Sequence, residues 1–276
     1  MKRDYNIELF RILLMFGICV YHCITQGTSN RAWVANMFQP CVVGFVFISG
    51  WYGIRFSVKK ILFLYGVAFW AATVFALYSM ALTGSSFWAV FRGVIFDAWF
   101  LHAYVVLMAL APLVNSSVEE KGWRAAWPLL LVVFGWGFAR TLPVVRGYIP
   151  TTAGLVYYSG ITLAGIYVAA RLVRKYDLMQ KMSLRVTSGI FFASLIVCSA
   201  GAGEYNSPAA LLLSLSTFRF FLALKVGNGL SRFIALVSPS MFFVYLVHGH
   251  QLFYRMPTGS IRSMEETMGG GGGGCR

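Results

Sequence analysis

The sequence predicts an all-α membrane protein: a polytopic bundle of about nine transmembrane helices with a cytoplasmic N-terminus. Hydrophobic residues make up 58% of the chain and charged residues only 12%, and the mean hydropathy is +0.70. A soluble domain of ordinary composition carries far less apolar surface. Nearly charge-free runs of about 20 residues, the length that crosses a bilayer as a helix, recur along the chain. We therefore expect a multi-pass protein of the cell membrane.

Charged residues divide the apolar runs into nine candidate spans. In chain order the spans are residues 7–24, 34–54, 61–82, 98–115, 126–139, 154–170, 186–203, 208–226 and 233–254. Glycine and serine at 84–86 break the helical pattern after the third span. The next segment, residues 87–96, is predicted to be an interfacial or re-entrant helix with Arg92 on its polar side.

The distribution of Lys and Arg predicts the orientation. With the N-terminus in the cytoplasm, 14 of these residues fall in cytoplasmic segments and seven fall outside. Such an excess on the cytoplasmic side is typical of membrane proteins. The formal net charge of +14 therefore comes from loops that flank the spans, and we expect no nucleic-acid partner.

The chain divides into a membrane-embedded domain, residues 1–254, and a polar tail, residues 255–276, which contains six consecutive glycines. Glycine loses the most conformational entropy on folding, so the tail is expected to be disordered. The five cysteines are scattered, and Cys19 and Cys23, one helical turn apart, lack the further ligands of a metal site. We expect neither a metal site nor a bound cofactor.

Ionisable side chains inside membrane spans are costly and mark candidate functional positions. Those inside a span or at its edge are Glu8, Arg11, His22, Asp97, His102, Arg219 and His248. Arg11 and His22 are eleven residues apart, and at about 100° per residue they project within about 20° of each other. The rise of about 1.5 Å per residue separates them by about 16 Å along the axis. They are expected to line one cavity or groove.

An extended ligand could touch both Arg11 and His22. Arg11, near the cytoplasmic headgroups, would meet the phosphates of a cytosolic donor, and Glu8 would pair with Arg11 and orient it. His22, deep in the membrane, suits proton transfer from an attacking hydroxyl to a leaving thiolate, or it could accept an acyl group itself. In the alternative interpretation, Glu8 and Arg11 only anchor the helix end and His22 is a structural residue.

The first span, YNIELFRILLMFGICVYHC, resembles the opening helix of the integral membrane acyltransferase family 3. Glu8, Arg11 and His22 fall on the family's acidic residue, its Arg or Lys and its His, with ten residues between the last two. Three further resembling segments follow in family order: VGFVFISGWYGIR with Phe45, Ser49 and Gly50, WFLHAYVVLMALAPLVN from Trp99 to Asn115, and SPSMFFVYLVH with Tyr245 and His248. The Arg-x10-His element is the most specific of them.

The resemblance implies an enzyme that transfers an acyl group, commonly acetyl from acetyl-CoA, to a hydroxyl of a surface polysaccharide or lipid-linked glycan. Its catalytic residues would be His22, Arg11 and Glu8, and Ser49, Trp99 and His248 would contribute to binding. The expected partners are an acyl-CoA donor, a glycan or lipid-linked acceptor and the lipid bilayer.

Three ionisable residues have less specific interpretations. Asp97 and His102 flank the start of the Trp99 segment, where they would line the same cavity or serve as an interfacial acid and a helix-packing histidine. Arg219 lies about 10 Å from the cytoplasmic end of its span. Its side chain would need to stretch to the interface, pair with an acid, or lie in an aqueous cavity and bind donor phosphate.

Two alternative functions remain open. A transporter or flippase-like protein would use Arg11 and Arg219 to bind an anionic solute. Members of the family also usually continue with another helix after the last resembling segment, whereas this chain turns into its polar tail. The second alternative is therefore an inactive, truncated acyltransferase that lacks the last helix.

Overall fold

The structure is a computed structural model that describes residues 4–27, 32–96, 98–141 and 160–248. Within these ranges the chain forms helices joined by short connections and contains no β-strand. The predicted all-α fold class is therefore confirmed. The predicted polar tail, residues 255–276, lies outside the described residues.

The N-terminal helices bring the first and second predicted spans together. These helices are α1 (Tyr5–Gly27), α2 (Ala32–Phe38) and α3 (Cys41–Tyr52). Pro40 separates α2 from α3 because it has no N–H group with which to continue α2, and its φ of −64° suits the start of α3. At Gly44, α3 approaches α1 so closely that a Cβ would lie 2.7 Å from a methyl carbon of Leu14.

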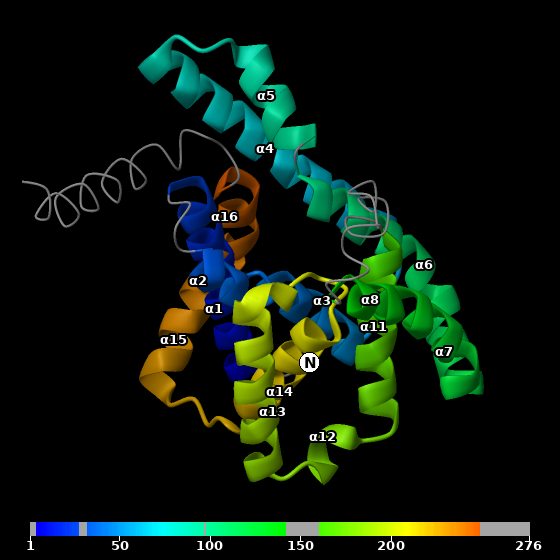
Figure 1. The fold of residues 1–276 in the computed structure, drawn as a ribbon. Coiled ribbons are helices and arrows are strands. Elements are labelled where there is room, and N and C mark those ends of the chain that lie inside the picture. Colours follow the sequence, from blue (N-terminus) through cyan, green and yellow to red (C-terminus); the bar gives the residue numbers. More distant parts are fainter. Residues whose placement is uncertain (1–3, 28–31, 97, 142–159, 249–276) are drawn as a thin grey trace, which may run out of the picture.

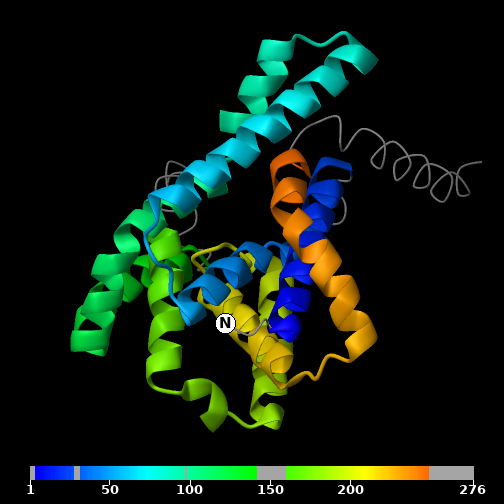
Figure 2. The ribbon, with the colours of Figure 1, turned by 180° about the vertical axis from the view of Figure 1, so that it is seen from behind.

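The next two helices, α4 (Val58–Thr83) and α5 (Phe87–Phe96), form a hairpin that extends beyond the other helices (Figure 1, Figure 2). Gly84 ends α4 with a left-handed φ of 67°, which glycine adopts without steric cost. Arg92 is exposed on α5, and its Nε donates a hydrogen bond to the Trp88 carbonyl at 3.2 Å. The interfacial or re-entrant position of this segment stays a prediction.

The remaining helices complete the bundle. They are α6 (Trp99–Lys121), α7 (Trp123–Leu130), α8 (Trp136–Thr141), α11 (Gly160–Lys175), α12 (Leu178–Lys181), α13 (Leu184–Val197), α14 (Pro208–Ala223), α15 (Asn228–Val237) and α16 (Met241–His248). The helical path continues through π-helical turns at residues 131–135 and 198–202. Near the end of the described chain, α16 lies beside α1, so the last described helix returns to the first (Figure 1, Figure 2).

Six described segments are long and apolar enough to cross a membrane. They are Tyr5–Thr25, Trp33–Tyr52, Val58–Thr83, Trp99–Lys121, Leu184–Ala202 and Asn228–His248. The predicted spans 126–139 and 208–226 correspond to shorter apolar helices, and the predicted span 154–170 is described only in part. Six of the predicted spans therefore coincide with helices of membrane-crossing length, while the count of nine and the cytoplasmic N-terminus stay predictions.

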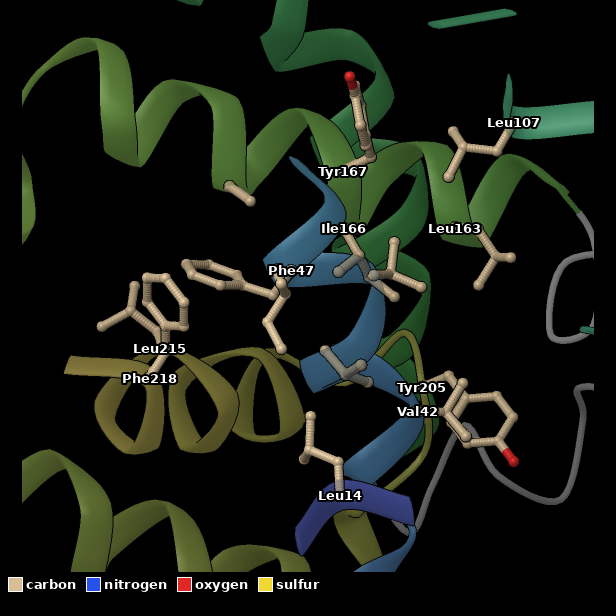
Figure 3. Packing of buried hydrophobic residues seen from close by; sticks show 14 of the residues in the cluster. Leu14, Val42, Phe47, Leu107, Leu163, Ile166, Tyr167, Tyr205, Leu215 and Phe218 are labelled. Carbon is tan, nitrogen blue, oxygen red and sulfur yellow. The ribbon is translucent and has the colours of Figure 1, made fainter. Parts of the chain in front are cut away.

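The main apolar core surrounds α3. Phe47 is fully buried and lies between α11 and α14, with its ring centroid 5.3 Å from that of Phe218 (Figure 3). At Gly50, a Cβ would lie 2.5 Å from the Tyr167 carbonyl oxygen and 2.7 Å from the Cβ of Ala170. Only glycine permits this approach, which positions α3 against α11.

A polar ring fixes the C-terminal end of α3. The Tyr167 hydroxyl donates to Asn115 Oδ1 at 2.7 Å and accepts from the Ile54 N–H at 2.8 Å. Asn115 Nδ2 donates to the Ile54 carbonyl at 3.1 Å. These bonds satisfy polar groups that would be costly to leave unpaired in an apolar interior, and they tie the chain after α3 to α6 and α11.

Candidate active site

A cavity of about 900 Å³ lies between α1, α3, α5, α6 and α16. One stripe of α1 lines it along its length, through Glu8, Arg11, Met15, Ile18 and His22. These residues recur every three or four positions, the spacing that places side chains on one face of a helix. Arg11 and His22 therefore line the same cavity, as their spacing predicts.

One end of the cavity carries an ion pair. Arg11 Nη1 lies 2.7 Å from Glu8 Oε1, with side-chain exposures of 38% for Arg11 and 16% for Glu8. The pair forms because residues three apart on a helix are neighbours. A guanidinium carries several N–H donors, so one contact with Glu8 orients Arg11 without using its whole donor capacity.

The middle of the cavity contains two hydroxyl groups from neighbouring helices. Ser49 Oγ on α3 donates to the Phe45 carbonyl at 3.0 Å, so its lone pairs face Tyr104 on α6, whose hydroxyl oxygen is 3.4 Å away. Both residues line the cavity. The 3.4 Å separation is long for a hydrogen bond between hydroxyls, so a ligand group can displace it at little cost.

The other end of the cavity contains two histidines. The rings of His22 on α1 and His248 on α16 have centroids 5.1 Å apart and planes inclined at 65°. His248 is 5% exposed, and its Nδ1 is hydrogen-bonded to the Tyr245 carbonyl one turn earlier. An imidazole pair in an otherwise largely apolar pocket is suited to moving a proton.

Aromatic side chains hold α16 against α6 beside this histidine pair. The Tyr245 hydroxyl accepts a hydrogen bond from the Leu101 N–H at 3.3 Å, and the Tyr245 ring lies 5.7 Å from that of Phe100. Trp99 at the start of α6 stacks on Tyr205, with centroids 5.6 Å apart and planes at 21°. Both Trp99 and Tyr205 line the cavity, so its wall near α6 is strongly aromatic.

Most of the residues singled out in the sequence come together here. Those that line the cavity are Glu8, Arg11, His22, Ser49, Trp99 and His248. Sequence reasoning missed Tyr104 and Tyr205. Tyr104 stands within the WFLHAY segment, five residues after Trp99, and a hydroxyl in an apolar span was the signal that could have identified it. Tyr205 follows α13 in a connection whose sequence carries no comparable signal.

His102 does not line this cavity. Its Nε2 lies 3.0 Å from the Ile95 carbonyl oxygen and its Nδ1 lies 3.0 Å from the Tyr65 hydroxyl. Because a carbonyl only accepts, Nε2 carries the proton and Nδ1 accepts from Tyr65. His102 thus joins α4, α5 and α6, which favours the interpretation as a helix-packing histidine. Its binding of donor or substrate stays a prediction.

Arg219 and Asp97 are not part of the site as described. Arg219 stands on α14 outside the cavity lining, and its Nε is buried without a hydrogen-bond partner among the described residues. Arg219 therefore lies outside this cavity, and its binding of donor phosphate stays a prediction. Asp97 lies outside the described residues. Within the described ranges, no three His, Cys, Asp or Glu side chains are grouped to hold a metal ion.

The sequence matches the acyltransferase domain of acyltransferase family 3 over residues 4–258. The chain belongs to this acyltransferase family. The match covers all the elements that line the cavity, including both histidine-bearing helices. No curated protein and no solved structure gives a significant match.

Membership makes the protein an acyltransferase enzyme with several membrane-spanning helices. The acyltransferase cavity combines an ion pair at one end, hydroxyl groups along its wall and two imidazoles at the other end. Such a site can bind an anionic group at the first end and transfer protons at the second.

Proposed function

We propose that this acyltransferase moves an acyl group, in the simplest case acetyl, from a cytosolic CoA thioester to a hydroxyl of a surface polysaccharide or lipid-linked glycan. The observation that carries the proposal is that one cavity contains Arg11 at one end and His22 at the other. An acyl-CoA has phosphates at one end of a long arm and a thioester at the other. Its two ends therefore match the two ends of the cavity.

Basic side chains support donor entry beside Arg11 and a cytoplasmic N-terminus. The Tyr52 hydroxyl at the end of α3 donates to Asp4 Oδ2 at 2.8 Å, which brings this helix end to the start of α1. Arg174 near the end of α11 donates to the Trp51 carbonyl, and the Lys175 Nζ donates to the Val118 carbonyl at 2.8 Å. The excess of cations at these ends fits the inner surface of a cell membrane.

In the proposed reaction, His22 acts as general base and then as general acid. The acceptor hydroxyl gives its proton to His22 as its oxygen attacks the thioester carbonyl. The carbon–sulfur bond then breaks, and the leaving sulfur takes the proton from His22. No other reactant is required, because the proton that leaves the acceptor is the one that the thiol receives.

The function can be tested on cells with and without the gene. Mass spectrometry of surface glycans and of their lipid-linked precursors should show an ester-linked acyl group that disappears when the gene is deleted. The lost mass identifies the acyl group, and an acetyl ester is expected. Unchanged acylation of every glycan and lipid-linked precursor would contradict the proposal.

Replacing Arg11 by glutamine should weaken binding of the CoA donor. We expect the KM for acetyl-CoA to rise about 30-fold, which corresponds to the loss of roughly 2 kcal/mol from a charge-assisted contact. The KM for acetyl-pantetheine, which lacks the phosphates, should stay within about threefold of the wild-type value. The measurement is thiol release by the purified full chain in nanodiscs.

A matched control is Arg92→Gln, because Arg92 is exposed on α5 and does not line the cavity. This variant should leave both KM values unchanged. An equal rise in the KM for both donors in Arg11→Gln would show that Arg11 does not recognise phosphate. A transporter that uses Arg11 for an anionic solute would instead lose solute flux and have no thiol release to lose.

A further inference from the structure

The histidine pair at the end of the cavity joins two helices that are far apart in the sequence. His22 is near the end of α1, and His248 is the last described residue of α16. Their ring centroids are 5.1 Å apart. In an imidazole each nitrogen lies about 1 Å from the ring centre, and a hydrogen bond spans about 3 Å, so one N–H···N bond separates two centroids by about 5 Å. The observed separation suits a direct interaction.

The hydrogen bond of His248 fixes which of its nitrogens can take part. Its Nδ1 is bonded to the Tyr245 carbonyl, which can only accept. Nδ1 therefore carries the proton, and in the neutral ring Nε2 has a free lone pair. Since His248 is 5% exposed and lines the cavity, this lone pair is held within the site rather than in bulk solvent.

We propose that His248 is a positioning residue for His22, with its Nε2 accepting a hydrogen bond from the His22 ring. This contact would fix the tautomer and the orientation of His22, so that its other nitrogen faces the acceptor hydroxyl. It would also stabilise the imidazolium that forms when His22 takes the proton. The inference rests on the proposed role of His22 as general base and assigns a partner to that residue.

Among the described residues, His248 is a titratable group from another helix whose ring contacts the ring of His22. On its own helix the titratable neighbours are Cys19, Tyr21 and Cys23, of which Tyr21 makes an edge contact at 5.1 Å. The Glu8–Arg11 pair stands more than three turns away on the same helix. The walls from α3, α5 and α6 contribute apolar and hydroxyl side chains to the cavity.

Two amide substitutions distinguish the role of Nδ1 of His248 from the role of Nε2. The carboxamide of His248→Asn can replace Nδ1 at the Tyr245 carbonyl but is too short to reach the position of Nε2. The carboxamide of His248→Gln reaches further and offers an acceptor near that position. If His248 had a purely structural role, based on the bond to Tyr245, the kcat of His248→Asn would be the higher of the two. The proposed role predicts the higher kcat for His248→Gln.

The experiment measures kcat and the donor KM of the full chain in nanodiscs, with acetyl-CoA as donor and a methyl glucoside as hydroxyl probe. We expect His248→Asn to lower kcat about 100-fold with the donor KM within about threefold of wild type, because the step that is lost is proton transfer. His248→Gln should keep kcat within about tenfold of wild type.

The matched control is Val247→Ala, a packing change at a buried neighbour on α16 that does not line the cavity. Its kcat should stay within about threefold of wild type. A kcat for His248→Asn equal to or above that of His248→Gln would overturn the inference, as would a kcat loss in Val247→Ala as large as in His248→Asn. If one amide variant fails to fold, the other is compared with wild type. A wild-type kcat in His248→Asn, or a complete loss of kcat in His248→Gln, would then overturn the inference.

The failure of this inference is distinguishable from the failure of the proposed function. If His22→Ala is inactive while His248→Asn keeps wild-type kcat, His248 has no positioning role and the proposed function stands. If the wild-type chain releases no thiol from acetyl-CoA and cells lose no acyl ester with the gene, the proposed function itself fails.

Discussion

Replacement of His22 by alanine is expected to lower acyl transfer at least about 10³-fold, the upper part of the range for loss of a general acid–base group. The variant should still insert and fold, because the His22 side chain lines a cavity instead of filling the core. The quantities to measure are the rate of thiol release and the amount of acylated product per folded protein. Retained acyl transfer in this variant would contradict the proposed role of His22 as general base.

The matched control is the same substitution at His102. This histidine bridges Tyr65 and the Ile95 carbonyl outside the cavity, so its loss should reduce stability without removing a catalytic group. Transfer per folded protein should remain within about threefold of wild type in His102→Ala. An equally large loss of transfer per folded protein in His102→Ala would contradict a special role for His22.

The stripe on α1 could be predicted because a single helix has a known period. Eleven residues return nearly to the same face, so the sequence alone brings Arg11 and His22 to one side. The cavity confirms this placement. No comparable spacing in the sequence relates α1 to the other helices that line the cavity. Their apolar residues indicate membrane spans, but hydropathy does not state which spans are neighbours.

His248 and His102 also show what the sequence does not reveal about neighbouring helices. Both are histidines in apolar helices, and their cost in the membrane is the same signal in each case. Tertiary packing brings His248 to His22, whereas His102 finds partners in Tyr65 and the end of α5. The sequence pattern could not separate them because the difference lies in residues distant in the chain. Only the resemblance of the SPSMFFVYLVH segment to a family motif indicated the importance of His248.

Gly50 illustrates a steric requirement that hydropathy also does not reveal. The sequence places it in a segment that resembles the family, while the structure supplies the reason that a side chain is excluded. A Cβ there would lie 2.5 Å from the backbone oxygen of Tyr167. Backbone cannot swing away as a side-chain tip can, so α3 and α11 would have to separate. Gly50→Ala is therefore expected to reduce the free energy of unfolding by about 3 kcal/mol, as for overpacking of a core.

Gly66→Ala is the matched control, because Gly66 is within α4 and a Cβ there would meet nothing within 4 Å. Denaturation of the two variants in mixed micelles should show a lower free energy of unfolding for Gly50→Ala and no reduction for Gly66→Ala. Stability of Gly50→Ala within about 0.5 kcal/mol of wild type would contradict the close packing of α3 on α11. Since Ser49 adjoins Gly50 and lines the cavity, a shift of α3 should also raise the donor KM of the folded fraction. The glycine thus links the stability of the bundle to the shape of its acyl-transfer site.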